Sequence, residues 1–124
     1  MFTPEQNKEV VVDFYDQAFN RNQPKEASAA YIGDVYVQHH PGVPDGPGAL
    51  SGHVTQLRRE FPDFVLDIKR ALAEDDMVVT HSLLVRKSGD PGLAMVDIFR
   101  LENGKIVEHW DVIQEVPENS VNMV

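Results

Sequence analysis

The chain contains no cysteine, and this absence removes several kinds of chemistry at once. Without thiols there can be no disulfide framework, no thiolate nucleophile and no zinc–thiolate centre. No stretch approaches the roughly 20 apolar residues that a membrane-spanning helix requires. The first residues, Met1–Glu5, also lack the basic and apolar regions of a signal peptide. We therefore expect a cytoplasmic protein that contacts no membrane.

Cationic side chains are scarce. Lys and Arg number 11 against 20 Asp and Glu, which gives a formal net charge of −9, and no basic cluster is longer than the pair Arg58-Arg59. Because nucleic-acid binding needs a concentrated cationic face, this charge balance argues against such a partner. It does not exclude a neutral small molecule.

Motifs for phosphate binding and for covalent catalysis are missing as well. Gly42, Gly46 and Gly48 are not followed by the Lys-Ser/Thr pair of a phosphate-binding loop, and no serine nucleophile elbow is present. The histidines could assemble a metal site with a carboxylate, but they do not have the short fixed spacing of a dedicated metal motif. We expect no metal and no cofactor.

What the sequence does contain is a regular series of helix and strand patterns. Thr3, Pro4 and Gln6 have the spacing of a capped helix start, and apolar residues then recur at helical period to about Phe19. Further helices are predicted at about 25–31 and 49–61. Strand patterns cover 35–39, the segment from 64 to a turn at 74–76, 77–86, 93–102 and 105–114. This order predicts one α+β domain over 1–124, with a loose tail at 117–124 and three helices in the concavity of a curved, mostly antiparallel sheet.

The last two strands flank Asn103-Gly104, the strongest short signal for a hairpin. Counting outward from a two-residue turn pairs Phe99 with Glu108 and Asp97 with Trp110. Strict alternation then places Asp97, Phe99, Leu101, Ile106, Glu108 and Trp110 on one face, which we take as concave because it holds the larger aromatic residues. His109 and Asp111 fall on the convex face.

Asp97 is the strongest candidate for proton chemistry, because a carboxylate on an apolar wall is suited to general-base work. The alternative is an Asp bonded to a backbone amide or to an arginine. His81 on the preceding strand could orient this carboxylate, or it could be a packing residue. Alternation allows only one of His39 and His40 into a pocket, and His53 is expected at the surface. Tyr15 on the first helix could offer its hydroxyl to the same pocket.

Two blocks of sequence resemble a known family. Tyr36-Val37-Gln38-His39-His40-Pro41 and the run from Val96 to Asp111 are similar to the SnoaL-like polyketide cyclases of the NTF2-like superfamily. The resemblance covers about residues 4–116 and implies a cone-shaped, cystatin-like α+β barrel with a deep apolar pocket. It also implies a homodimer formed through the sheet. Where many relatives have His-Asn-Pro, this chain has His39-His40-Pro41.

The resemblance further implies an intramolecular aldol condensation on a small apolar carbonyl compound, without metal or cofactor. It assigns the general base to Asp97 and supporting roles to His81 and His39. Side chains expected to bind the substrate are His40, Tyr36, Tyr15, Phe14, Phe99 and Trp110. Two alternatives stay open: an isomerase or dehydratase that uses the same pocket, and a non-catalytic module for ligand binding or dimerisation.

Overall fold

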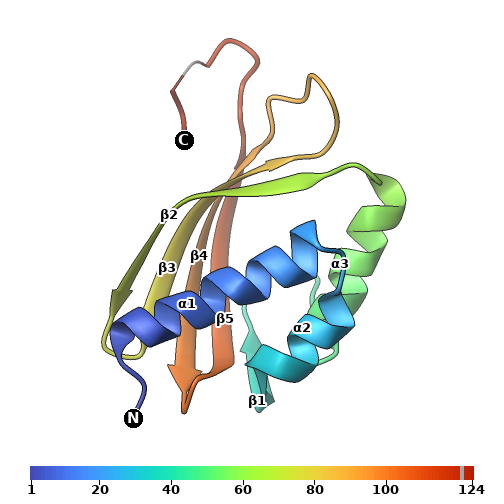
Figure 1. Ribbon diagram of the computed structural model, residues 1–124. Helices are drawn as coiled ribbons and strands as arrows, with labels where there is room; N and C mark the ends of the chain where they lie inside the picture. Colours follow the sequence, from blue (N-terminus) through green and yellow to red (C-terminus); the bar gives the residue numbers. More distant parts are fainter. Residues whose placement is uncertain (121) are drawn as a thin grey trace.

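The computed structural model describes residues 1–120 and 122–124, and it consists of helices packed on one face of a five-stranded sheet (Figure 1). The helices are α1 (Pro4–Tyr15), α2 (Pro24–Tyr31) and α3 (Ala49–Glu60), with a π-helical turn η1 (Asp16–Asn20) after α1. The strands are β1 (Ile32–Gln38), β2 (Val65–Glu74), β3 (Met77–Val85), β4 (Leu93–Glu102) and β5 (Lys105–Glu115). The expected α+β architecture is confirmed.

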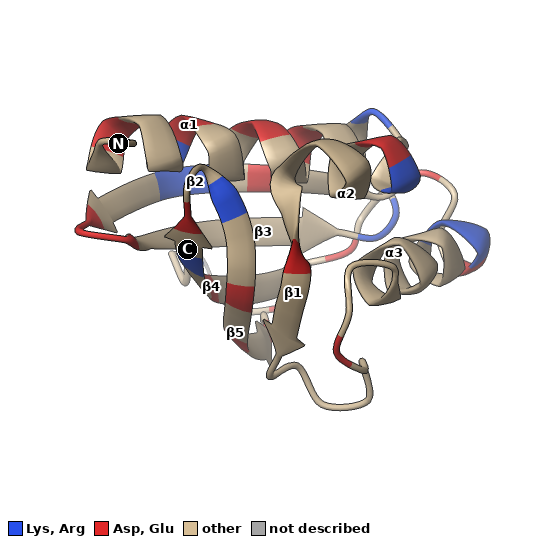
Figure 2. Cartoon of the chain, turned by 90° about the horizontal axis from the view of Figure 1, so that it is seen from below, with Lys and Arg blue, Asp and Glu red and all other residues tan. Residues whose placement is uncertain are grey.

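The strand order in the sheet is β1-β5-β4-β3-β2. The chain forms β2 to β5 as a continuous antiparallel meander, while β1 pairs in parallel with β5. The sheet curves around the helices, so it has an inner face that they cover and an outer face that they do not (Figures 1 and 2). Within the described residues, no helix is long and apolar enough to cross a membrane.

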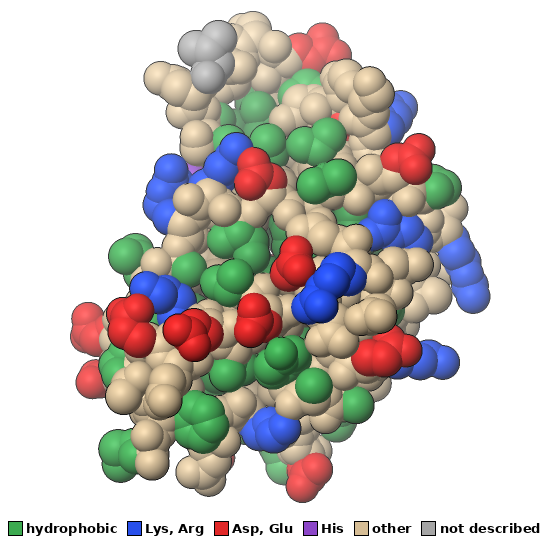
Figure 3. Space-filling model, viewed as in Figure 1, with side chains coloured by type: hydrophobic (Ala, Val, Ile, Leu, Met, Phe, Trp, Pro, Cys, Tyr) green, Lys and Arg blue, Asp and Glu red, His purple; other side chains and the backbone are tan. Residues whose placement is uncertain are grey.

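The start of α1 forms as its sequence predicts. Gln6 N donates to the Thr3 hydroxyl at 3.1 Å, and Thr3 N donates to the Gln6 side chain at 2.9 Å, which completes the capping box. The predicted single helix is nevertheless divided, since Arg21 N donates to Asp16 O and widens the last turn into η1. Such π-turns change the direction of the side chains that follow them. The outward side of α1 carries a row of acidic residues (Figures 2 and 3).

The core lies between the inner face of the sheet and the helices. Strict alternation in β3 buries Val78, Thr80, Ser82 and Leu84, while the intervening side chains face outward. Aromatic rings from α1 and η1 pack edge-on against this layer, and Tyr15 meets Phe99 with ring centroids 5.1 Å apart. This packing holds the C-terminal half of α1 directly over β4 and β5.

The hairpin between β4 and β5 begins as predicted and then departs from simple counting. Asn103 and Gly104 have φ of +50° and +77°, as a type I′ turn requires, and Leu101 pairs with Ile106. A β-bulge then inserts one extra residue, so that Arg100 pairs with Glu108. Both Ile106 and Val107 are buried. Every residue of β5 beyond the bulge consequently faces the side opposite to the one predicted.

The bulge lies where β5 contacts β1. Val107 lies against Gly33 of β1, where an added Cβ would be only 3.1 Å from the Val107 methyl. The pairing of β1 with β5 is irregular over the same segment.

The C-terminal end of the chain begins beside the loop before β4, where Val116 N donates to Gly92 O at 3.0 Å. Residue 121, in the tail expected to be loose, lies outside the described residues.

Candidate active site

A cavity of about 240 Å³ opens between the helices and the inner face of the sheet. This volume is just below the usual range for ligand sites, roughly 300–1,000 Å³, and suits a small molecule. Most of its wall is apolar, and its polar groups gather on one side. The lining residues are Tyr15, Phe19, Gln38, His40, Val43, Leu50, His53, Leu57, Leu84, Leu93, Met95, His109, Asp111 and Ile113.

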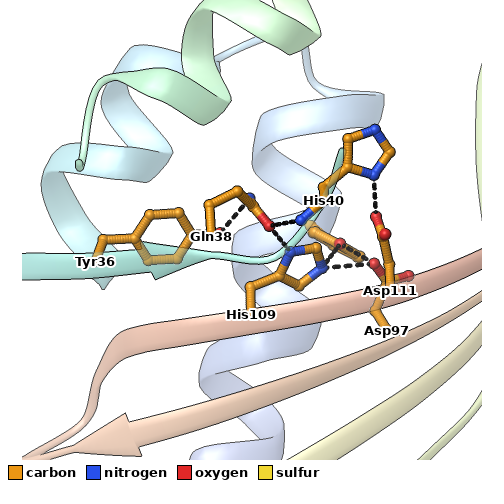
Figure 4. Close-up of polar contacts among 7 residues, drawn as sticks. Tyr36, Gln38, His40, Asp97, His109 and Asp111 are labelled. Carbon is orange, nitrogen blue, oxygen red and sulfur yellow. Dashed lines mark hydrogen bonds and ion pairs between the residues drawn. The ribbon is translucent and has the colours of Figure 1, made fainter. Parts of the chain in front are cut away.

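The first polar group of the site is a fully buried pair on adjacent strands. His109 Nε2 of β5 lies 2.7 Å from Asp97 Oδ1 of β4, and both side chains are almost completely buried (Figure 4). The Tyr15 hydroxyl donates to the same carboxylate oxygen at 2.6 Å and lies 3.3 Å from His109 Nε2. Asp97 Oδ2 is buried and has no hydrogen-bond partner among the described residues. Of this trio, Tyr15 and His109 line the cavity and Asp97 lies behind them.

The second group is a histidine–aspartate pair that faces the cavity. His40 Nδ1 lies 2.6 Å from Asp111 Oδ2, and the two side chains retain 21% and 7% of their exposure (Figure 4). Both residues belong to the cavity wall. A carboxylate bonded to Nδ1 fixes the orientation of an imidazole and leaves Nε2 to exchange protons. This is the arrangement of a general base.

Gln38 joins the two pairs. Its Oε1 lies 2.7 Å from His109 Nδ1 and accepts the backbone N–H of His40 at 3.0 Å. Its Nε2 donates to the Tyr36 hydroxyl at 3.0 Å. The hydrogen bonds therefore run without interruption from Tyr36 through Gln38 to both histidines.

Burial controls the ionisation of the phenols and of the histidine at the rim. It raises the pKa of Tyr15 well above its usual range, and the neighbouring Asp97 carboxylate adds to this shift. Burial also raises the pKa of Tyr36. For His53, partial burial and the nearby His40 lower the pKa, against an opposing effect of Asp111. Both phenols thus keep their protons, and His53 is neutral at pH 7.

Two residues expected in the pocket lie on the outer face instead. His39 is 40% exposed, bonds Glu108 at 2.8 Å and stacks on Trp110 with ring centroids 4.8 Å apart. Trp110 was predicted to face inward opposite Asp97, but the bulge gives that place to Asp111. Of the two adjacent histidines, it is therefore His40 that reaches the cavity.

His81 does not meet Asp97 either. In the observed register it pairs with Val96, while Thr80 pairs with Asp97. Because neighbouring residues of a strand point to opposite faces, the imidazole of His81 lies on the outer face, where it contacts Arg70. The expected convergence of Asp97, His81 and His39 on one cavity is thus wrong.

The remaining predicted side chains divide between the wall and the core. Tyr15 lines the cavity, whereas Phe14, Phe99 and Tyr36 are buried in the core and are not part of the lining. Phe14 packs on the rings of Tyr15 and Tyr31. Phe99 supports the wall indirectly, since its ring lies 4.9 Å from that of His109.

Sequence reasoning missed four polar residues of the site: Gln38, His53, His109 and Asp111. Alternation along β1 places Gln38 and His40 on the same side as buried Tyr36, and that signal could have identified both. His53 was expected at the surface; it is exposed on its outer side but its ring also lines the cavity, 5.2 Å from that of His40. The inward direction of His109 and Asp111 carried no local signal, because it depends on the bulge.

Three side chains of the site have the composition of a metal-binding set. One ligand atom from each of Asp97, His109 and Asp111 lies within 4.8 Å of the other two. His109 Nε2 and Asp97 Oδ1 are bonded to each other, however, and Asp111 Oδ2 is bonded to His40. These three atoms are thus already paired, while Asp97 Oδ2 has no partner among the described residues.

A comparison with the curated proteins found none that matches this chain. Among solved structures, TsrD from Streptomyces laurentii is 18% identical over 91% of each chain, with a TM-score of 0.77. A candidate polyketide cyclase from Acidithiobacillus ferrooxidans is 23% identical over 91% of each chain, with a TM-score of 0.73. A candidate ketosteroid isomerase from Kribbella flavida is 20% identical over 96% of this chain and 85% of its own, with a TM-score of 0.73.

At these identities the solved structures establish a shared fold. The model of the SnoaL-like domain family matches residues 11–109, which include Tyr15, Asp97 and His109. That match extends over most of the chain and agrees with the family expected from the Gln-His-His block and the last hairpin. The chain therefore belongs to the family of SnoaL-like domains.

Proposed function

We propose that this domain is a small acid–base enzyme that transfers a proton at the carbon next to a carbonyl group, as in an intramolecular aldol cyclisation. The substrate would be a small, largely apolar carbonyl compound, and the reaction would need neither metal nor cofactor. The observation that carries the proposal is the pair His40–Asp111, which lies on the wall of an apolar cavity beside the buried pair Asp97–His109. Relatives in fold described as a polyketide cyclase and a ketosteroid isomerase are consistent with such chemistry.

In this proposal His40 is the group that meets the substrate. Asp111 accepts the proton on Nδ1, so Nε2 of a neutral His40 carries the lone pair that removes a proton from the substrate carbon. The C–H bond breaks, its electron pair forms an enolate, and the enolate carbon bonds to a second carbonyl carbon of the same molecule. The resulting alkoxide takes the proton back from His40, which leaves the enzyme unchanged.

Asp97 keeps a role in this scheme, although a different one from that expected from the sequence. Because Tyr15 and His109 separate it from the cavity, Asp97 acts through them. Its carboxylate accepts the proton of the Tyr15 hydroxyl and lies 2.7 Å from His109 Nε2, so it holds both side chains at the polar end of the cavity. Polar groups fixed in this way need no reorganisation during the reaction, unlike mobile water.

The test begins with mass spectrometry of any small molecule that co-purifies with the protein. Exchange of its carbon-bound hydrogen for deuterium in D2O then measures proton transfer directly. His40→Gln and Asp111→Asn should slow this exchange by about 100-fold or more, the usual contribution of a general base. The matched control is His39→Gln, which changes the adjacent histidine on the outer face and should leave the rate unchanged. Equal rates in His40→Gln and wild type would refute the proposal.

We also propose that a second copy of the chain binds to the outer face of the sheet. Leu72 and Val112 are 66% and 70% exposed on this face, and Val96, which pairs with Val112, is 38% exposed. Val96 and Val112 lie on the neighbouring strands β4 and β5, and exposed aliphatic side chains grouped in this way are typical of an interface core. Sedimentation velocity should give a dimer for wild type and a monomer for Val112→Lys. A wild-type monomer at high micromolar concentration would contradict this proposal.

A further inference from the structure

Gln38 is the point at which the two histidine–aspartate pairs meet. It is the last residue of β1, the residue is only 8% exposed, and its side-chain amide makes three hydrogen bonds (Figure 4). The partners are the backbone N–H of His40 at 3.0 Å, His109 Nδ1 at 2.7 Å and the Tyr36 hydroxyl at 3.0 Å. Two of these three contacts converge on the same atom, Oε1.

The chemistry of these partners fixes the orientation of the amide. A backbone N–H can only donate, so the amide atom that it contacts must be the oxygen. The same oxygen lies 2.7 Å from His109 Nδ1, and two acceptors at that distance would repel each other. Nδ1 of His109 must therefore carry a proton.

The other nitrogen of His109 is constrained from the opposite side. Nε2 lies 2.7 Å from Asp97 Oδ1, and the Tyr15 hydroxyl has already directed its proton to that oxygen at 2.6 Å. A bare lone pair on Nε2 would face the lone pairs of a carboxylate, so one more proton must lie between them. His109 and Asp97 together thus hold two protons, either as imidazolium and carboxylate or as neutral imidazole and carboxylic acid.

We propose that Gln38 is a positioning residue that locks His109 with a proton on Nδ1 and thereby confines proton exchange to the nitrogen facing Asp97 and Tyr15. The same oxygen accepts the backbone N–H of His40 and so fixes the position of the backbone that carries the cavity-facing imidazole. Gln38 thus couples the two pairs, and this inference adds a positioning residue to the acid–base function proposed above. On the opposite side of the ring, Nε2 of His109 lies 2.7 Å from Asp97 Oδ1 and 3.3 Å from the Tyr15 hydroxyl.

The inference can be tested on the ligand-free protein by NMR of histidine labelled with 15N, with the His109 signals assigned by their loss in His109→Gln. Wild type should show a proton on Nδ1 of His109. Gln38→Glu keeps an oxygen that accepts from both N–H groups, so the Nδ1–H signal should persist. Gln38→Met has nearly the same shape but no acceptor, so this signal should be lost.

Tyr36→Phe is the matched control, because it removes the partner of Gln38 Nε2 and leaves both contacts of Oε1 in place. Its His109 signals should match those of wild type. A wild-type His109 without a proton on Nδ1, a retained signal in Gln38→Met, or an equal loss in Tyr36→Phe would each overturn the inference. If Gln38→Met does not fold, Gln38→Glu still tests the inference, because loss of the Nδ1–H signal in that variant would overturn it. Since no substrate is used, this result is independent of whether deuterium exchange is observed.

Discussion

Replacing Tyr15 with phenylalanine removes a single oxygen atom from the most deeply buried part of the site. That oxygen donates to Asp97 at 2.6 Å, and both residues are at most 2% exposed. A hydrogen bond to a charged group contributes about 1.5–3 kcal/mol, against about 1 kcal/mol for a neutral pair. Tyr15→Phe should therefore lower the free energy of unfolding by about 2–3 kcal/mol. Asp97→Asn should cost about 2–4 kcal/mol, because His109 loses its charged partner.

The combination of the two changes isolates their interaction. In the Asp97→Asn background the Tyr15 hydroxyl meets a neutral amide oxygen, so its removal should cost only about 1 kcal/mol. The double-mutant cycle should consequently give a coupling free energy of about 1–2 kcal/mol. Since a small domain has about 5–15 kcal/mol of stability, the double variant should still fold.

Urea denaturation followed by circular dichroism at pH 7 measures all four proteins of the cycle. With a typical dependence of about 1–2 kcal/mol per molar urea, Tyr15→Phe alone should shift the midpoint by about 1–3 M. Asp67→Asn serves as a control, because that exposed aspartate pairs only with Lys69 and should change stability by less than about 1 kcal/mol. A coupling below about 0.5 kcal/mol would refute the charged acceptor on which these magnitudes rest and would assign the neutral imidazole and carboxylic acid to the His109–Asp97 pair.

Three further predictions concern the scaffold. Hydrogen bonds from Arg86 hold the pKa of Asp90 well below its usual range, so the stability that they contribute is complete above about pH 4 and is lost as the pH falls below it. Asp90→Asn should thus have a lower melting temperature than wild type at pH 7. A difference in melting temperature that did not shrink toward pH 2 would contradict this. Gly104→Ala should cost about 1–2 kcal/mol in urea denaturation, because φ is +77° in the turn, and no loss would exclude a type I′ turn. Asn20→Ala should cost about 1–2 kcal/mol, since its side chain makes two bonds of 2.8 Å to the backbone of Leu66, and a hydrogen-exchange rate at Leu66 N equal to that of wild type would argue against them.

Several features of this protein could be determined from the sequence alone because they depend on neighbouring residues. The capping box at Thr3 and Gln6 and the type I′ turn at Asn103-Gly104 are local hydrogen-bonding and φ preferences, and both are present as predicted. Period-2 alternation likewise placed Asp97 and Phe99 correctly on the inner face. The family could also be identified at this level.

The composition of the site was decided by contacts between segments far apart in the chain. The bulge at Val107 forms where β5 meets Gly33 of β1, and nothing near Asn103-Gly104 indicates it. A single added residue exchanges the two faces of a strand, so His109 and Asp111 replaced the predicted Trp110 inside. The sequence therefore determined that the hairpin bearing Asp97 would line a pocket. Only the tertiary structure decided which of its side chains face inward, because register beyond a bulge is a property of strand pairing and not of the strand itself.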